Sequence, residues 1–295
     1  MAELTDSSLP VFLTDLGVPG IIDPHVHFMP DSVMQKVWAY FESGGELVGR
    51  SWPISYRIPE VQRIATLAEL GVLRFGALSY AHKPGMAQWL SQWSLEFADR
   101  VPQALRCATF YPEVGVLDYV GEAIAAQAQL FKVHVQVGDF DLRDSHLDAV
   151  WGLLSEVQIP TVVHVGSGPI PGKFTGAEPL AALMRRHPRL PVIVAHFGVR
   201  EELEMLRLAQ DYPSLLLDTT MVGTDFMEAD HPFDRALLPQ VRELGLAGRV
   251  LFGSDFPNIP YPYAHQVVAL QRWDLGDDWM RAVLWENASR LFSWP

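Results

Sequence analysis

The chain has 295 residues, of which 49% are hydrophobic and 19% are charged. This composition supports a large folded core and argues against disorder. The net charge of -13 excludes nucleic acid and anionic membrane surfaces as favoured partners, because both repel an acidic protein.

Three further features bear on the cellular setting. A single cysteine, Cys107, cannot form an intrachain disulfide, which fits a reducing compartment. A secretory signal would have a basic region followed by an apolar stretch, and the first ten residues have no such pattern. No apolar run approaches the ~18–20 residues that a membrane helix needs. We therefore expect a cytoplasmic, soluble protein.

Short, nearly continuous apolar runs recur along the chain, and helical patterns separate them. Such runs are typical of strands that are buried on both faces of a parallel sheet. The predicted strands cover residues 20–22, 72–80, 105–111, 130–137, 161–167, 191–197, 214–220 and 249–255. The predicted helices cover residues 60–70, 86–99, 116–129, 147–154, 178–187, 201–210, 233–244 and 277–285.

Eight strands that alternate with helices predict an α/β fold, a (β/α)8 TIM barrel that forms one domain over residues 1–295. A doubly wound open sheet is the alternative. It has less support, because no glycine-rich nucleotide-binding signature follows the first strand.

A long insertion at about residues 28–58 follows the first predicted strand. It contains a helical pattern over 33–41 and then the segment GRSWPISYRIP at 49–59. In a barrel this insertion would lie on the catalytic rim. It is either an ordinary packed insertion or a lid lined by Trp52, Tyr56 and Arg57.

Titratable residues stand at the ends of several predicted strands. His25 and His27 follow the first strand with one residue between them, so in an extended segment both point the same way, as does Asp23. His164, His196 and Asp255 occupy the ends of three later strands, where barrel enzymes build their active sites. Each histidine alone could be an inert core residue. An aspartate at the end of an apolar strand, however, loses hydration unless it is paired or bound to a cation.

The arrangement resembles the amidohydrolase superfamily, and more closely its amidohydrolase-related branch, which includes decarboxylases and lactone hydrolases. The matching motifs, spread over nearly the whole chain, are IIDPHVHF, TVVHVGSG, VAHFG, LFGSDFP and ENASRLF. The resemblance implies a catalytic divalent metal, which we expect to be a single zinc ion, with manganese or a second metal as alternatives. The metal ligands that it implies are His25, His27, His164 and Asp255.

The resemblance also implies roles for residues beside the metal. Asp255 would take a proton from the attacking water, and His196 would act as an acid or base or bind a second metal. Lys132 and His134 share one face of the fourth strand. Lys132 is either a carboxylated lysine that bridges two metals or an ordinary ammonium group that pairs with a carboxylate. His134 is expected to face the substrate or to support the ligands.

Other candidates are weaker. Arg57 and Arg200 could bind a substrate carboxylate through their guanidinium groups, and each has the alternative role of a surface charge. Trp52 is a candidate lid residue. The remaining histidines are expected at the surface: His82, His146, His187, His231 and His265.

These observations predict a metal-dependent hydrolase that cleaves a C–O or C–N bond of a small carbonyl or carboxylate substrate. A metal-dependent, non-oxidative decarboxylase of a small carboxylic acid, which could be aromatic, is the first alternative. A metal-binding barrel without catalysis is the second. The expected partner is a small molecule, and the resemblance suggests a homodimer.

Overall fold

The computed structural model describes residues 4–43 and 51–294. The chain divides into two compact units. Unit 1 comprises Met1–His27, Asp31–Phe75 and Thr219–Pro295, and unit 2 comprises Phe28–Pro30 and Gly76–Asp218. Unit 1 thus joins the two ends of the chain, whereas unit 2 is almost one continuous stretch. The single domain expected from the sequence stays a prediction.

Unit 2 is built on a parallel sheet whose strands follow one another in chain order. The strands are β4 (Cys107–Thr109), β5 (Leu130–His134), β6 (Thr161–His164), β7 (Val192–Val194) and β8 (Leu215–Asp218). Their apolar side chains are buried. This confirms that the continuous apolar runs mark strands covered on both faces.

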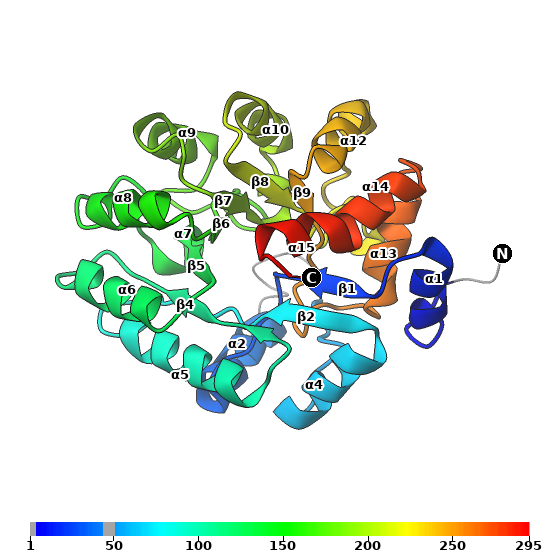
Figure 1. Ribbon diagram of the computed structural model, residues 1–295, viewed down its shortest axis with the longest axis horizontal. Coiled ribbons are helices and arrows are strands. Elements are labelled where there is room, and N and C mark those ends of the chain that lie inside the picture. The colour runs from blue at the N-terminus through cyan, green and yellow to red at the C-terminus, as the bar shows by residue number, and fades with distance from the viewer. Residues whose placement is uncertain (1–3, 44–50, 295) are drawn as a thin grey trace. The chain divides into compact units, whose positions relative to one another are not determined.

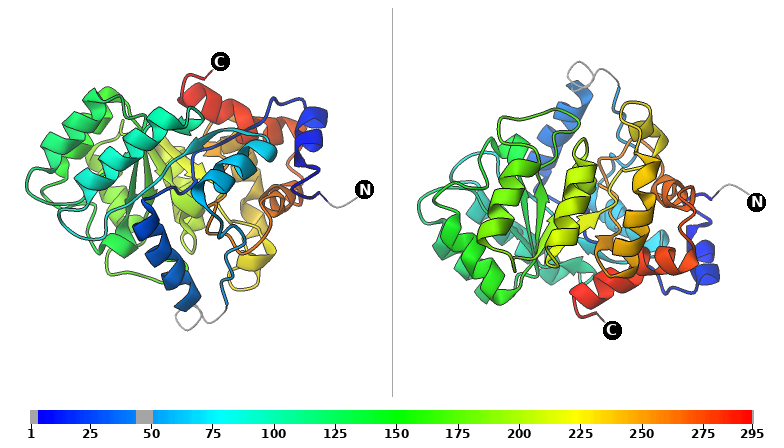
Figure 2. Two further views of the ribbon diagram at one scale, coloured as in Figure 1. Left: turned by 90° about the horizontal axis from the view of Figure 1, so that it is seen from below. Right: turned by 90° about the horizontal axis from the view of Figure 1, so that it is seen from above.

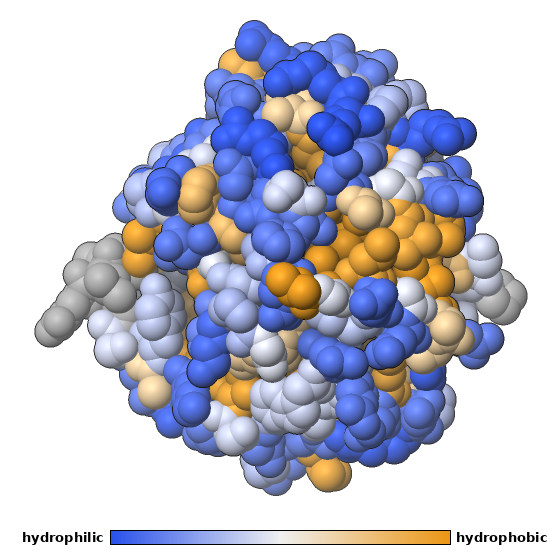
Figure 3. Space-filling model, turned by 90° about the vertical axis from the view of Figure 1, so that its left-hand side faces the viewer, coloured by the Kyte–Doolittle hydropathy of each residue, from blue (hydrophilic) through white to orange (hydrophobic). Residues whose placement is uncertain are grey.

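Helices connect these strands and lie outside the sheet (Figure 1 and Figure 2). They are α5 (Ala87–Arg100), α6 (Val116–Ala125), α8 (Asp148–Val157), α9 (Ala177–Arg186) and α10 (Glu202–Asp211), and a two-residue strand, β3 (Ala104–Leu105), follows α5. The predicted apolar stripe on α8, which includes Trp151 and Leu154, is buried. A side view shows hydrophilic residues over most of the visible surface (Figure 3).

Unit 1 contains the first strands and the C-terminal part of the chain. Strand β1 (Ile21–Asp23) pairs in parallel with β2 (Val72–Gly76), and β9 (Val250–Leu251) belongs to the same unit. Its helices are α1 (Leu9–Leu16), α2 (Asp31–Ser43), α4 (Glu60–Glu69), α11 (Asp225–Glu228), α12 (Leu238–Leu246), α13 (Ala264–Gln271), α14 (Asp277–Arg281) and α15 (Asn287–Leu291). A short 3-10 helix (Arg235–Leu237) precedes α12, and a π-helical turn (Ala282–Glu286) joins α14 to α15.

Most predicted strands end earlier than expected, and two of them, β5 and β7, end at or next to a histidine. β5 ends at His134, whose Nδ1 accepts the Val137 N–H at 3.3 Å and caps the short helix α7 (Val135–Gly138). β7 ends at Val194, and the next four residues form a 3-10 turn (Ala195–Gly198) in which His196 has φ 56°. Side-chain acceptors that bind main-chain N–H groups compete with the strand ladder, which explains both endings.

Two aromatic residues of the insertion after β1 are buried. Residues 44–50, which include Gly49 and Arg50 of the segment singled out in the sequence, lie outside the described residues. Trp52 is buried, and its indole N–H donates to the Asn258 carbonyl oxygen at 2.7 Å. Tyr56 is also buried against the Phe256 ring.

Among the described residues, no helix combines the length and the apolar character that crossing a membrane requires.

Candidate metal centre

The chain leaves β1 at Asp23 and immediately presents two histidines. Pro24 has no N–H to donate to a ladder, so the strand ends there. His25 and His27 still point the same way, as the alternation of an extended segment predicts. Their ring centroids lie 5.3 Å apart in an edge-on arrangement.

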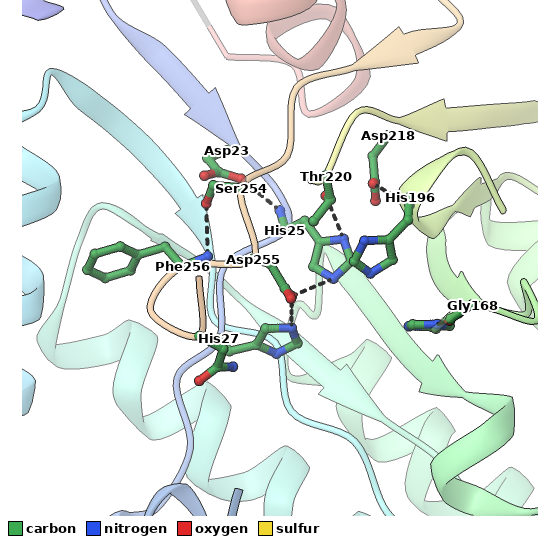
Figure 4. Close-up of polar contacts among 12 residues, drawn as sticks. Asp23, His25, His27, Gly168, His196, Asp218, Thr220, Ser254, Asp255 and Phe256 are labelled. Carbon is green, nitrogen blue, oxygen red and sulfur yellow. Dashed lines mark hydrogen bonds and ion pairs between the residues drawn. The ribbon is translucent and has the colours of Figure 1, made fainter. Parts of the chain in front are cut away.

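Two main-chain hydrogen bonds join this segment to the residues that follow β9. The Asp255 N–H donates to the His25 carbonyl at 2.9 Å, and the His27 N–H donates to the Phe256 carbonyl at 2.7 Å. Asp255 has φ 71°, a left-handed conformation that is uncommon for aspartate. The two segments thus lie side by side, which places the Asp255 carboxylate against both imidazoles (Figure 4).

The three side chains form a compact, buried donor set. Asp255 Oδ1 lies 2.9 Å from His27 Nε2 and 3.6 Å from His25 Nε2. One ligand atom from each residue lies within 4.8 Å of the others. His25, His27 and Asp255 are only 1%, 4% and 9% exposed. Two imidazoles and a carboxylate held this closely suit a divalent transition metal, so the residues fit the metal that the sequence predicts.

The second nitrogen of His25 is also engaged. His25 Nδ1 lies 3.0 Å from the Thr220 hydroxyl. When Nε2 offers its lone pair to a metal, Nδ1 carries the proton and donates it to this oxygen, which fixes the ring. Gly253 leaves the room for this contact, because a Cβ there would lie 2.1 Å from Thr220 Oγ1.

Asp23 holds the main chain of the histidine segment. Its Oδ1 accepts the His25 N–H at 3.1 Å, and its Oδ2 accepts the Tyr263 O–H at 2.8 Å. The structure places the Asp23 carboxylate behind His25, on the backbone and on a buried tyrosine.

Unit 2 brings three other histidines together at the ends of its strands. His134 is paired with His164 across β5 and β6, and their rings stack with centroids 3.9 Å apart. The His196 ring follows at 4.8 Å from the His164 ring. His164 Nε2 lies 3.2 Å from the Gly168 carbonyl. A carbonyl only accepts, so this nitrogen carries the proton and Nδ1 presents the lone pair.

The neighbours of these histidines are buried polar residues. The His196 N–H donates to Asp218 Oδ1 at 2.8 Å, which anchors the left-handed turn that carries the ring. Lys132 is 1% exposed on β5, and the Thr109 hydroxyl donates to its carbonyl at 2.7 Å. The ligand role of His164, the catalytic role of His196 and the state of Lys132 stay predictions.

The remaining candidates lie elsewhere. The exposed Arg57 forms an ion pair with Glu42 and lies over the Trp38 ring. Arg200 is exposed with φ 83°. Their roles in substrate binding, like those of Trp52 and His134, stay predictions. Of the histidines expected at the surface, His82 and His146 are exposed. The other three, His187, His231 and His265, are half-buried.

Sequence reasoning missed three residues that support the candidate site: Thr220, Asp218 and Tyr263. Thr220 and Asp218 stand at the end of a predicted strand, in SLLLDTT, and this position was their only signal. Tyr263 lies in the aromatic stretch FPNIPYPYAH at 256–265, and its buried partner Asp23 is 240 residues away.

Comparisons with known proteins support the predicted fold and family. The family model described as Amidohydrolase matches residues 22–294. No curated protein matches the chain in sequence. Many solved structures match it in fold, although at low sequence identity.

One similar structure is an uncharacterised TIM-barrel protein from Bordetella bronchiseptica, with 16% identity and a TM-score of 0.74 over 93% of this chain and 98% of that one. A 5-carboxyvanillate decarboxylase from Novosphingobium aromaticivorans with bound manganese has 15% identity and a TM-score of 0.67, over 95% of this chain and 98% of that one. An amidohydrolase from Burkholderia multivorans with bound zinc has 16% identity and a TM-score of 0.64, over 94% of this chain and all of that one. These matches confirm the predicted TIM-barrel fold and the predicted resemblance.

Proposed function

Because the chain belongs to the amidohydrolase family, we propose that it is a metal-dependent hydrolase that cleaves a C–O or C–N bond of a small carbonyl or carboxylate substrate. The observation that carries this proposal is the buried cluster of His25, His27 and Asp255. The family match favours an enzyme over the non-catalytic barrel considered from the sequence.

Zinc is the proposed metal, with one ion per chain. Two imidazole nitrogens and one carboxylate oxygen are common zinc ligands, and manganese accepts the same set. The similar structures that contain zinc and manganese support this choice of metals. His164 remains the predicted fourth ligand, and its Nδ1 lone pair suits that role.

A divalent metal at this position would lower the pKa of a water molecule and polarise a substrate carbonyl. The side chains of the protein would bind this metal, orient its ligands and accept the proton. His25 and His27 hold the ion, and the Thr220 hydroxyl keeps the His25 ring in place. The Asp255 carboxylate accepts the proton of the attacking water, because an ionised carboxylate beside the reacting atoms can act as a general base.

His196 is the proposed acid or base for the leaving group. Imidazole is the side chain whose ordinary pKa lies nearest neutral pH, which suits it to proton transfer. The hydrogen bond from its main-chain N–H to Asp218 keeps the turn in one conformation. Such positioning favours proton transfer, which requires the donor and acceptor to be within hydrogen-bond reach.

Metal analysis together with turnover tests this proposal. The purified protein should contain about one zinc or manganese ion per chain, and a chelator should abolish hydrolysis of a panel of small lactones and cyclic amides. Adding zinc back should restore the activity. Asp255→Asn should lose both metal and turnover. If the metal-free protein turned over substrate as fast as the metal-loaded protein, the mechanism would be refuted.

A decarboxylase is the second candidate. It is favoured by the similarity in fold to 5-carboxyvanillate decarboxylase over 95% of the chain. The same residues would then hold a metal beside a substrate carboxylate. Incubation with small aromatic carboxylic acids distinguishes the two candidate functions, because only a decarboxylase releases carbon dioxide.

For either function we propose a small-molecule substrate and a homodimer. Sedimentation tests the dimer.

A further inference from the structure

A buried tyrosine hydroxyl connects the two segments that carry the proposed ligands. Tyr263 is 0% exposed. Its O–H donates to Asp23 Oδ2 at 2.8 Å, and its oxygen accepts a hydrogen bond from the Ser254 hydroxyl. Asp23 precedes His25 by two residues, and Ser254 directly precedes Asp255. The hydroxyl therefore contacts a residue on each side of the cluster.

Each contact of Tyr263 continues to the main chain of its segment. Asp23 Oδ1 accepts the His25 N–H at 3.1 Å. Ser254 Oγ accepts the Phe256 N–H at 3.0 Å, and Figure 4 shows both bonds as dashed lines. Any movement of the tyrosine hydroxyl would be transmitted to both backbones, because buried hydrogen bonds of this kind are costly to leave unmade.

Tyr263 keeps its proton under all ordinary conditions. Burial, and then the charge of Asp23, raises the pKa of its phenol well above the usual value. The hydroxyl therefore always has one hydrogen to donate. Asp23 Oδ2 accepts this hydrogen.

Hydrogen bonds that involve the N-terminal part of the chain also hold Tyr263 in place. The Tyr263 N–H donates to the Tyr56 hydroxyl oxygen at 2.7 Å, and the Tyr56 O–H in turn forms a short hydrogen bond to Asp6. Asp6 also accepts the Ala264 N–H at 2.8 Å. Ala264 begins α13, which has no side-chain cap of its own. An acidic acceptor at a helix N-terminus stabilises that end, so Asp6 and Tyr56 hold the turn that carries Tyr263.

We propose that Tyr263 is a positioning residue of the metal centre, whose hydroxyl holds the segments of His25 and Asp255 in the arrangement that binds the ion. The inference rests on the proposed function, since it requires that the cluster binds a metal. Groups that orient metal ligands typically change metal affinity by 10–100-fold when they are removed. Tyr263 acts one step further out, through the backbone, so we expect an effect near the lower end of this range, about 10-fold.

The test is Tyr263→Phe, which removes the hydroxyl and keeps the ring. Affinity for zinc is measured by competition with a chromophoric chelator, and cobalt is used as a second probe because its visible spectrum reports ligand geometry. Tyr119→Phe is the matched control. Tyr119 is also buried, and its hydroxyl also donates to a carboxylate, Glu113, but both residues lie in unit 2.

The expected result is a roughly 10-fold weaker zinc affinity and an altered cobalt spectrum for Tyr263→Phe, with both unchanged for Tyr119→Phe. Equal affinity and an unchanged spectrum in Tyr263→Phe would overturn the inference while leaving the proposed function intact. Equal losses in both variants would also overturn it, because they would indicate a general loss of stability. Should Tyr263→Phe fail to fold, Ser254→Ala removes the other contact of the hydroxyl and should give the same change. A wild-type protein that binds neither ion would overturn the proposed function itself.

Discussion

Gly253→Ala should damage the candidate site through one added methyl group. The new Cβ would lie 2.1 Å from Thr220 Oγ1 and 3.1 Å from His25 Cβ. Real Cβ contacts below 3.0 Å essentially do not occur, so the threonine oxygen must move by about an ångström. The Thr220–His25 hydrogen bond is 3.0 Å long, and a shift of that size, or a rotamer change that avoids the clash, breaks it.

The magnitude follows from two parts. Overpacking of a rigid interior typically costs about 1–3 kcal/mol. A lost hydrogen bond adds about 0.5–1.5 kcal/mol. We therefore expect the free energy of unfolding to fall by about 1.5–4.5 kcal/mol. Zinc affinity should also fall, because the His25 ring loses the contact that orients it.

Urea denaturation of the metal-free protein and a zinc titration measure the two effects. Gly121→Ala is the control, because Gly121 lies within α6 and a Cβ there meets nothing within 4 Å. That variant should gain up to about 1 kcal/mol from helix propensity and bind zinc normally. If Gly253→Ala were as stable as the wild type and bound zinc equally well, the argument for a sterically required glycine would be refuted.

Three further outcomes are expected. Burial raises the pKa of the Cys107 thiol to about 12, so at pH 7–9 the thiol should react with Ellman's reagent only after urea unfolds the protein; fast reaction of the native protein would contradict this. Glu201 accepts the Ser167 N–H at 2.8 Å and also the Ser167 hydroxyl, so Glu201→Gln should lower the free energy of unfolding by about 1–2 kcal/mol, whereas Glu204→Gln, at an exposed position in the first turn of α10, should lower it by less than about 1 kcal/mol. His196→Asn should reduce turnover by about 10²–10⁴-fold without loss of bound metal, and a lower metal content would instead point to a ligand role.

The strand and helix pattern was largely predictable because it is local. Strands of unit 2 are mostly apolar, and each of the helices between them has one apolar face, so short windows of sequence contain the signal. Several short helices of unit 1, among them α1, α11 and α13, escaped prediction. In α13 residues 267–270 are consecutive apolar residues, so no single apolar stripe stands out in the sequence. Helix α1 is only eight residues long.

The candidate site was predictable in part. His25, His27 and Asp255 could be named because strand ends in barrels collect functional residues, and the structure brings these three together. Their supporting contacts could not be predicted. Thr220 meets His25 across 195 residues of chain, and Gly253 matters only because of that contact. Such contacts depend on how distant segments of the chain meet in space. The local sequence around either residue does not indicate them.

The main-chain bonds between the His25–His27 and Asp255–Phe256 segments also have a consequence for folding. His27 and Asp255 are 228 residues apart, and neither segment alone supplies the donor set. The three ligand atoms can come together only after both ends of the chain have joined, which makes their pairing one of the most non-local in the protein. If the cluster binds zinc as proposed, tight binding requires a chain in which both segments have already met. A ribosome-bound chain that ends before β9 should leave zinc in solution.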